Sequence, residues 1–239
     1  MSYRPKLIAT DLDGTICPHA APISKRTIAA LTRANEMGVK VFFVTGRPPR
    51  WMNQIKEAFD FGQAICSNGG LLWDLHQEKV LEEWRITPAD LRTTITKLRS
   101  AVPDIYFAFE NHGDFRREKK YEARWDKGVD ENGVDDILDY IENGAIKLLA
   151  RGSDKLFNSD ELLAIAQREV GDIVTVTHSN PWESLLEISA HNVSKGDTLA
   201  VICERLKIDR EDVVAFGDNP NDFSMLEFAG RSYIMSDGH

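Results

Sequence analysis

Short apolar runs that stop abruptly at polar clusters constrain this chain more than any other feature. They are rich in β-branched and aromatic side chains and lie at residues 6–10 (KLIAT), 39–45 (VKVFFVT) and 63–67 (QAICS). Such runs are typical of buried parallel strands. Between them, residues 24–38 predict a helix that begins at the N-cap Ser24 and ends at Gly38, and residues 48–59 predict a second helix. This strand–helix–strand rhythm predicts a parallel α/β sheet.

The pattern changes after about Leu71. We expect a hairpin at 71–84, helices at 88–102, 133–142 and 159–170, and strands at 104–110, 145–152, 172–179 and 182–189. The first pattern then returns, with helices at 194–207 and 219–229 and strands at 212–217 and 231–235. The sequence therefore predicts an α/β protein. Its Rossmann-like parallel sheet core comprises residues 1–83 and 189–239, and residues 84–188 form an inserted α+β domain.

Composition narrows the classes of partner. The 239 residues are 42% hydrophobic and carry a formal net charge of −9, which suits a folded protein and argues against nucleic-acid binding. A basic stretch at 116–127 (RREKKYEARWDK) is diluted by three acidic residues, so we interpret it as solvated surface. A local positive site for an anionic substrate remains compatible with this composition.

The sequence says less about cellular location and oligomeric state. The three cysteines, Cys17, Cys66 and Cys203, are too few and too scattered for a disulfide framework, which predicts a reduced, cytoplasmic compartment. No apolar stretch is long enough to cross a bilayer and the first residues lack a signal-peptide core, so no membrane partner is expected. The sequence does not indicate an oligomeric state.

Four polar clusters lie at ends of these elements: DLDGT (11–15), TGR (45–47), SKG (194–196) and GDNPND (217–222). Ligands of open parallel sheets bind beyond the carboxyl ends of the strands. Each cluster alone has an ordinary explanation as a turn or a helix cap. Asp11 and Asp13 are the exception that needs a cause, because burying carboxylates is costly unless hydrogen bonds or a cation compensate them. These two acids either lie at a turn or share a cation.

In this order, the four clusters resemble the motifs of the haloacid dehalogenase-like superfamily of aspartate-nucleophile phosphatases. The large insert between the second and third clusters, with SNGG (67–70) and LLEISAHNVSKGDTL (185–199), is similar to the capped, subclass IIB-like Cof-type sugar-phosphatase group. The resemblance covers essentially the whole chain. Proteins of that group usually continue into a further helical segment, whereas this sequence ends at His239.

The resemblance implies an activity. We expect a Mg²⁺-dependent phosphomonoester hydrolase that acts on a small phosphorylated metabolite, a sugar phosphate being the expected class, through an aspartyl-phosphate intermediate. A phosphomutase of the same fold and a non-catalytic binding protein are the alternatives. The six histidines show no zinc-binding spacing, so zinc is not expected.

The resemblance also implies roles for the matching residues. Asp11 is the expected nucleophile and Asp13 the general acid and base. Phosphate contacts are expected from Thr45, Gly46, Lys195 and Asn221, with Lys195 also counted as catalytic. The expected Mg²⁺ ligands are Asp11, the Asp13 backbone carbonyl and Asp218, while Asp222 would orient a metal-bound water or Lys195.

Other residues are candidates for contacts with the organic part of the substrate. Arg47 and Asn68 belong to the core, and Arg47 could equally pair with a surface acid. In the inserted domain, the polar loop after residue 177 carries His178, Ser179, Asn180 and Trp182. Imidazole, hydroxyl, amide and indole groups suit sugar hydroxyls and ring faces, so we expect these four side chains to touch the leaving group.

Overall fold

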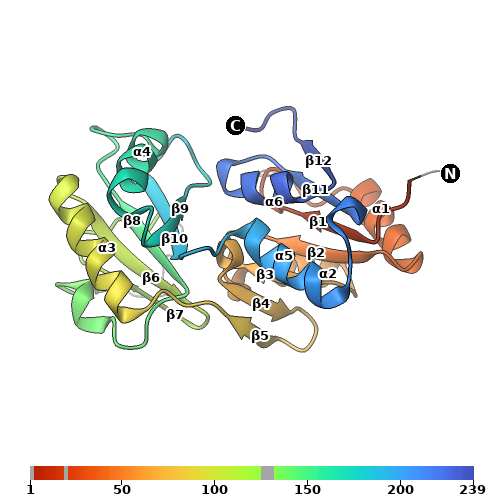
Figure 1. Cartoon of the computed structure of the whole chain (residues 1–239), viewed down its shortest axis with the longest axis horizontal. Coiled ribbons are helices and arrows are strands. Elements are labelled where there is room, and N and C mark those ends of the chain that lie inside the picture. The colour runs from red at the N-terminus through yellow and green to blue at the C-terminus, as the bar shows by residue number, and fades with distance from the viewer. Residues whose placement is uncertain (1–2, 19–20, 125–131) are drawn as a thin grey trace. The chain divides into compact units, whose positions relative to one another are not determined.

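The chain folds into two compact units. The structure, a computed structural model, describes residues 3–18, 21–124 and 132–239 (Figure 1). Unit 1 combines Met1–Glu83 with Val193–His239, and unit 2 is the continuous segment Trp84–Asn192. Unit 2 therefore lies in the chain between the two segments of unit 1.

The described residues of unit 1 form a seven-stranded sheet in the order β12-β11-β1-β2-β3-β4-β5. Its strands are β1 (Leu7–Thr10), β2 (Lys40–Val44), β3 (Gln63–Cys66), β4 (Leu71–Asp74), β5 (Lys79–Glu83), β11 (Val213–Gly217) and β12 (Arg231–Ile234). The strands from β12 to β3 run parallel, and β4 and β5 continue the sheet antiparallel. The predicted Rossmann-like core with a terminal hairpin is confirmed.

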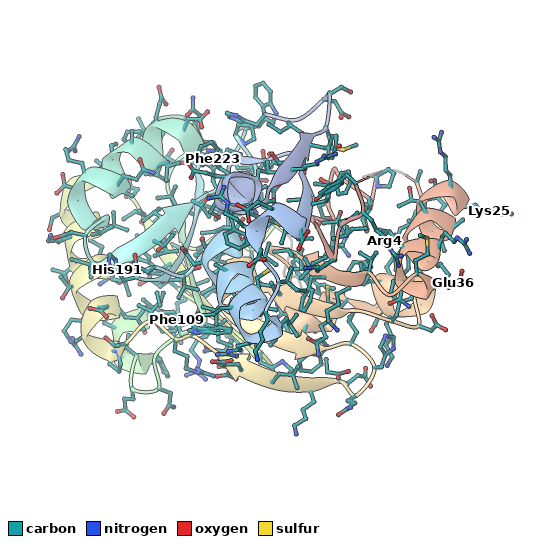
Figure 2. All side chains as sticks on the ribbon, turned by 45° about the vertical axis from the view of Figure 1, so that its right-hand side comes forward. Arg4, Lys25, Glu36, Phe109, His191 and Phe223 are labelled. Carbon is teal, nitrogen blue, oxygen red and sulfur yellow. The ribbon has the colours of Figure 1, made fainter. Side chains whose placement is uncertain are left out.

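Unit 1 contains four α-helices and four short 3₁₀ turns in the described residues. They are α1 (Lys25–Glu36), α2 (Asn53–Ala58), α5 (Lys195–Leu206), α6 (Phe223–Phe228), η1 (Pro49–Trp51), η2 (Ser67–Gly69), η4 (Arg210–Asp212) and η5 (Pro220–Asp222). Ser24 caps α1 as predicted, accepting from the Thr27 N–H at 3.0 Å. The ends of α1, Lys25 and Glu36, are exposed (Figure 2), whereas β2 is buried at every position after Lys40. Continuous burial is what a central parallel strand requires.

Unit 2 is an antiparallel sheet with helices on one face. Its order is β7-β6-β8-β10-β9. The elements are α3 (Pro88–Ala101), β6 (Tyr106–Asn111), β7 (Asp114–Arg117), η3 (Ile137–Tyr140), β8 (Lys147–Arg151), α4 (Ser159–Val170), β9 (Val174–Thr177) and β10 (Leu185–Ala190). Phe107 and Phe109 pack with the helices, and Phe109 is labelled in Figure 2, while the intervening Ala108 packs with Phe115 and Tyr121 in a second cluster. This period-two alternation assigns one face of the sheet to α3 and α4 and confirms the α+β fold of the insert.

One local prediction in unit 2 is wrong, and a second holds only in part. The helix expected at 133–142 is only the turn η3. The backbone of Val134 pairs instead with the segment after β7: its N–H donates to Arg117 O at 2.8 Å, and its carbonyl accepts from Lys119 N at 2.9 Å. The basic stretch, interpreted as solvated surface, begins as part of strand β7 and is only partly solvated, because Glu118 and Tyr121 are buried. Its residues 125–127 lie outside the described residues.

The cysteines and the helices give two further observations. Cys17, Cys66 and Cys203 are buried and carry free thiols. Among the described residues, no helix combines the length and apolar composition that a membrane span needs.

The N-terminus of α4 generates a prediction about stability. Asn158 Oδ1 accepts from Glu161 N at 2.9 Å, and Glu161 Oε2 accepts from Asn158 N at 3.0 Å, which is a reciprocal capping box. We expect Asn158→Ala to lower the free energy of unfolding by about 1 kcal/mol. Urea denaturation followed by circular dichroism measures this. Glu161→Gln, which keeps an acceptor at the same place, should lower the free energy of unfolding by less. An unchanged urea midpoint in Asn158→Ala would contradict a stabilising capping box.

Candidate active site

Three of the predicted clusters meet because their strands are neighbours in register. Thr10, the last residue of β1, pairs with Phe216 of β11 and Phe43 of β2. The residues that follow these strands therefore leave the sheet at one edge. Asp11, the first of them, is held there by its N–H, which donates to Phe216 O at 2.9 Å.

Lys195 occupies the centre of this edge. It is the first residue of α5 and its side chain is completely buried. Its Nζ donates to Asp11 Oδ1 at 2.6 Å and to Asp222 Oδ1 at 2.5 Å. Burial pushes the pKa of Lys195 down, but the two carboxylates together outweigh it and raise that pKa above its usual range. Lys195 is therefore a permanent buried cation.

The carboxylates around Lys195 outnumber it. One carboxylate oxygen from each of Asp11, Asp218 and Asp222 lies within 4.8 Å of the others, so the three residues could hold a metal ion. Burial raises the pKa of Asp11 to about 8, with Lys195 opposing the rise and Asp222 and Asp218 adding to it. Three carboxylates facing one ammonium leave two negative charges uncompensated when all are ionised, which is the charge of one divalent cation.

Asp218 is held by polar neighbours in the loop after β11 and by Thr15. The Thr15 hydroxyl donates to Asp218 Oδ1 at 3.0 Å, and the Asn219 amide donates to Oδ2 at 2.5 Å. Burial raises the pKa of Asp218, while the Thr15 hydrogen bond lowers it. Gly14 has a φ of +86°, and a Cβ there would lie 2.3 Å from Asp218 Oδ2. A larger residue at this position would be strained and would displace the Asp218 carboxylate.

Asp222 differs from the other two acids because it binds both the Lys195 ammonium and two backbone N–H groups. Oδ1 accepts from Lys195, and Oδ2 accepts from the backbone N–H groups of Asp218 at 2.9 Å and Asn219 at 3.1 Å. Its carboxylate therefore fixes both the ammonium and the loop that carries Asp218.

Asp13 lies apart from the three clustered acids. Arg47 binds its carboxylate with two hydrogen bonds, Nε to Oδ2 at 2.8 Å and Nη2 to Oδ1 at 2.5 Å. This bond to Asp13 raises the pKa of Arg47 further, although burial opposes it. Between the two possibilities left open for Arg47, the structure has the acid pair, and the acid is Asp13.

The remaining core candidates connect to this edge through the backbone. Thr45 is buried, and its hydroxyl accepts from the Arg47 N–H at 3.1 Å. Gly46 lies between these two residues. Asn68 is buried with a left-handed φ of 56°, and its Oδ1 accepts from Asn221 Nδ2 at 3.0 Å. Sequence reasoning missed this amide pair and the role of Thr15, although all three residues lay in motifs it had singled out.

The four candidates of unit 2 fall in the loop between β9 and β10 and differ in environment. His178 is buried, with its Nε2 2.8 Å from Asp160 Oδ1, and the Ser179 hydroxyl donates to Glu187. Asn180 accepts from the Trp182 N–H at 3.0 Å, while the Trp182 side chain is 89% exposed. Trp182 is thus the one of the four whose side chain extends into solvent.

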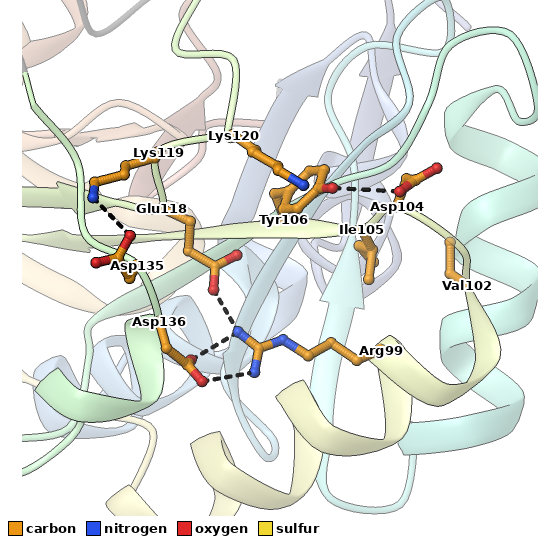
Figure 3. Close-up of a pocket in the computed structure, with 10 residues that line it drawn as sticks. All are labelled: Arg99, Val102, Asp104, Ile105, Tyr106, Glu118, Lys119, Lys120, Asp135 and Asp136. Carbon is orange, nitrogen blue, oxygen red and sulfur yellow. Dashed lines mark hydrogen bonds and ion pairs between the residues drawn. The ribbon is translucent and has the colours of Figure 1, made fainter.

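Unit 2 also contains a hollow of about 510 Å³, shown in Figure 3. It is lined by the end of α3, the start of β6 and two nearby segments. Arg99 pairs with Glu118 and Asp136, and Lys119 Nζ lies 2.6 Å from Asp135 Oδ1. Three basic residues face four acidic ones there, so this hollow has no positive excess with which to hold a phosphate.

Comparisons with known proteins agree with the geometry of unit 1. The model of the haloacid dehalogenase-like hydrolase family matches residues 8–239. A pyridoxal phosphate phosphatase of Escherichia coli is 28% identical over 96% of this chain and 87% of its own length. A 5-amino-6-(5-phospho-D-ribitylamino)uracil phosphatase of Bacillus subtilis is 24% identical over 100% of this chain and 89% of its own.

A solved structure gives the same fold. A sugar phosphatase of haloacid dehalogenase subclass IIB superposes with a TM-score of 0.79 at 20% identity, covering 98% of this chain and 88% of that one. The family match extends over nearly the whole chain and includes each cluster at the sheet edge. The protein therefore belongs to the haloacid dehalogenase-like hydrolases, and within them it is a phosphatase of the capped, Cof-type group.

Proposed function

We propose that this protein is a Mg²⁺-dependent phosphomonoester hydrolase that forms an aspartyl-phosphate on Asp11. One observation carries the proposal: a buried ammonium, Lys195, binds Asp11 and Asp222 at a sheet edge where Asp218 adds a further carboxylate. A phosphomonoester is surrounded by negative oxygens, so its hydrolysis requires charge neutralisation and an aligned nucleophile. Lys195 supplies a fixed positive charge beside the candidate nucleophile.

In this proposal the first half-reaction transfers the phosphoryl group to Asp11. Lys195 orients the carboxylate through Oδ1, and the carboxylate attacks phosphorus while the ester P–O bond breaks. Asp13 gives its proton to the leaving oxygen. In the second half-reaction the Asp13 carboxylate takes a proton from water, which attacks the aspartyl-phosphate and releases inorganic phosphate and free Asp11.

Hydrogen-bond donors around Asp11 would hold the phosphoryl oxygens. We assign this to the Thr45 hydroxyl, the Gly46 N–H, the Asn221 amide and Lys195. Support comes from their arrangement: Thr45 is buried at the sheet edge, and Asn221 is buried on the loop that Asp222 fixes. Asn221 shares one amide hydrogen with Asn68, so its second hydrogen is the one proposed to bind phosphate.

The donor set fits a magnesium ion. Asp11 and Asp218 would hold it together with the Asp13 backbone carbonyl, because hard oxygen ligands and a small site suit Mg²⁺. Asp222 would not bind the ion itself but would position its surroundings, by holding Lys195 and the loop that carries Asp218. When bound, the ion supplies positive charge that screens the nucleophile and the phosphoryl oxygens from one another.

The proposed substrate is a small phosphorylated metabolite, with a sugar phosphate as the class we favour. The two phosphatase relatives act on different phosphate esters, so the phosphoryl site alone does not set specificity. We assign leaving-group contacts to the inserted unit, with Trp182 as the main candidate because its indole is exposed. Indole faces pack well on sugar rings. The cytoplasmic location stays a prediction.

Replacing the nucleophile tests the chemistry. Asp11→Asn keeps the shape of the side chain but removes its charge, so turnover of 4-nitrophenyl phosphate should fall by at least about a thousandfold. Asp60→Asn, at an exposed acid of the same unit, is the matched control and should stay active. Near wild-type rates in a folded Asp11→Asn protein would exclude nucleophilic catalysis by this residue.

Metal removal gives a second test. A chelator should abolish activity, added Mg²⁺ should restore it, and Ca²⁺ should compete without supporting turnover because it favours looser coordination. Since burial raises the pKa of Asp11 to about 8, Mg²⁺ must displace a proton below that pH. Calorimetry should therefore find tighter Mg²⁺ binding as the pH rises from about 6 to about 8. Full activity in a metal-free sample would disprove the requirement.

The inserted unit generates a third test. Trp182→Ala should raise KM for the preferred sugar phosphate by roughly tenfold and leave 4-nitrophenyl phosphate nearly unaffected. Leu156→Ala removes another exposed apolar side chain of the same unit and should change neither substrate. Equal losses on both esters in the Trp182 variant would mean that the indole serves the fold or the chemical step.

A further inference from the structure

The pair formed by Arg47 and Asp13 has the geometry of a clamp. The guanidinium donates from two nitrogens to the two oxygens of one carboxylate, at 2.8 Å and 2.5 Å. Such a bidentate pair fixes the plane of the carboxylate as well as its position. Asp13 needs this support because its side chain is 47% exposed, against 15% for Arg47.

Arg47 is itself fixed on several sides. Its N–H donates to the Thr45 hydroxyl at 3.1 Å, and its carbonyl accepts from Ser67 N at 3.1 Å. The third guanidinium nitrogen, Nη1, donates to Trp51 O at 3.3 Å. All three side-chain nitrogens therefore donate to protein oxygens, and two of them donate to Asp13.

We propose that Arg47 is a positioning residue, which acts on the reaction through Asp13 and makes no contact with the phosphoryl group. The inference rests on the proposed function, in which Asp13 transfers the proton. Each Asp13 oxygen has two lone pairs and gives one to the clamp, so a second remains for the transferred proton. Proton transfer is sensitive to small misplacements of the acid, and an exposed carboxylate without the clamp would sample several rotamers.

The two roles open to an arginine at this position differ in which step they affect. A phosphate-binding arginine would assist every ester, with or without Asp13. A positioning arginine would matter only where Asp13 transfers a proton: to the leaving oxygen in the first half-reaction, and from water in the second. The rate decrease caused by losing the clamp should therefore depend on the leaving group. It should vanish when Asp13 cannot transfer a proton.

The test measures phosphoenzyme formation in single turnovers, with acid quench and mass spectrometry. The probes are 4-nitrophenyl phosphate, whose leaving group needs little protonation, and phenyl phosphate, whose leaving group needs more. We expect Arg47→Met to slow phosphorylation by phenyl phosphate roughly 10- to 100-fold, part of the usual contribution of general acid catalysis. With 4-nitrophenyl phosphate it should slow formation by less than about threefold, and phosphoenzyme should accumulate because the second half-reaction is impaired.

A double-mutant cycle decides the assignment. In an Asp13→Asn background, Arg47→Met should change phosphoenzyme formation from phenyl phosphate by less than about twofold, against the roughly 10- to 100-fold loss expected when Asp13 is present. A loss for phenyl phosphate that is equal with and without Asp13 would overturn the positioning role and make Arg47 a phosphate ligand. Absence of any phosphoenzyme in the wild-type protein with Mg²⁺ would instead refute the proposed function.

Two further variants guard against a purely structural effect. Arg47→Lys keeps the charge but cannot form the clamp, so it should recover only part of the loss, and full recovery would contradict the geometry. Arg205 also forms a two-bond pair, with Glu82, on the exposed surface of unit 1. Arg205→Met should leave both half-reactions at wild-type rates. A leaving-group-dependent loss in Arg205→Met as well would mean that disrupting any such pair in this unit produces the effect, and would overturn the inference.

Discussion

A single buried ammonium organises the candidate active site of this protein. Without Lys195, two buried carboxylates would face each other with no opposing charge, and the site would be strongly destabilised. With it, Asp11 and Asp222 are held by one donor, and Asp222 uses its other oxygen to fix the backbone that carries Asp218. The positions of Asp11, Asp218 and Asp222 therefore depend on Lys195, and the position of Lys195 depends on the start of α5.

The acids of this edge fall into two groups that do not share partners. Asp11, Asp218 and Asp222 gather around the ammonium, whereas Asp13 is held by Arg47. Separation of this kind suits a reaction in which one carboxylate must attack and another must exchange protons, since the two tasks require different surroundings. The loop after β1 makes this separation of the acids possible, because Gly14 lets the chain turn closely around Asp218.

The fold and the members of the central site could be predicted from the sequence because they depend on local signals. Apolar runs mark the strands, and the polar residues that follow them must share an edge if the strands are parallel. The Arg47–Asp13 clamp, the Asn68–Asn221 pair and the short η3 could not be predicted in this way. Each depends on contacts between segments distant in sequence, and in the last case pairing of Val134 with neighbouring backbone overrides a helical pattern. Exposure also separates Trp182 from the buried His178, which sequence composition treats alike.

The interrupted layout of unit 1 has a consequence for how the protein is made. Asp11 and its ammonium partner are 184 residues apart in the chain, and the whole of the continuous unit 2 lies between them. During synthesis, unit 2 is complete before α5 leaves the ribosome, so it can fold while the N-terminal half of the sheet still lacks β11 and β12. Asp11, the proposed nucleophile, then lacks its counter-charge until the last part of the chain completes the sheet. The candidate site therefore cannot assemble before the last part of the chain is made, and a ribosome-bound chain that stops short of Lys195 lacks the ammonium at its centre.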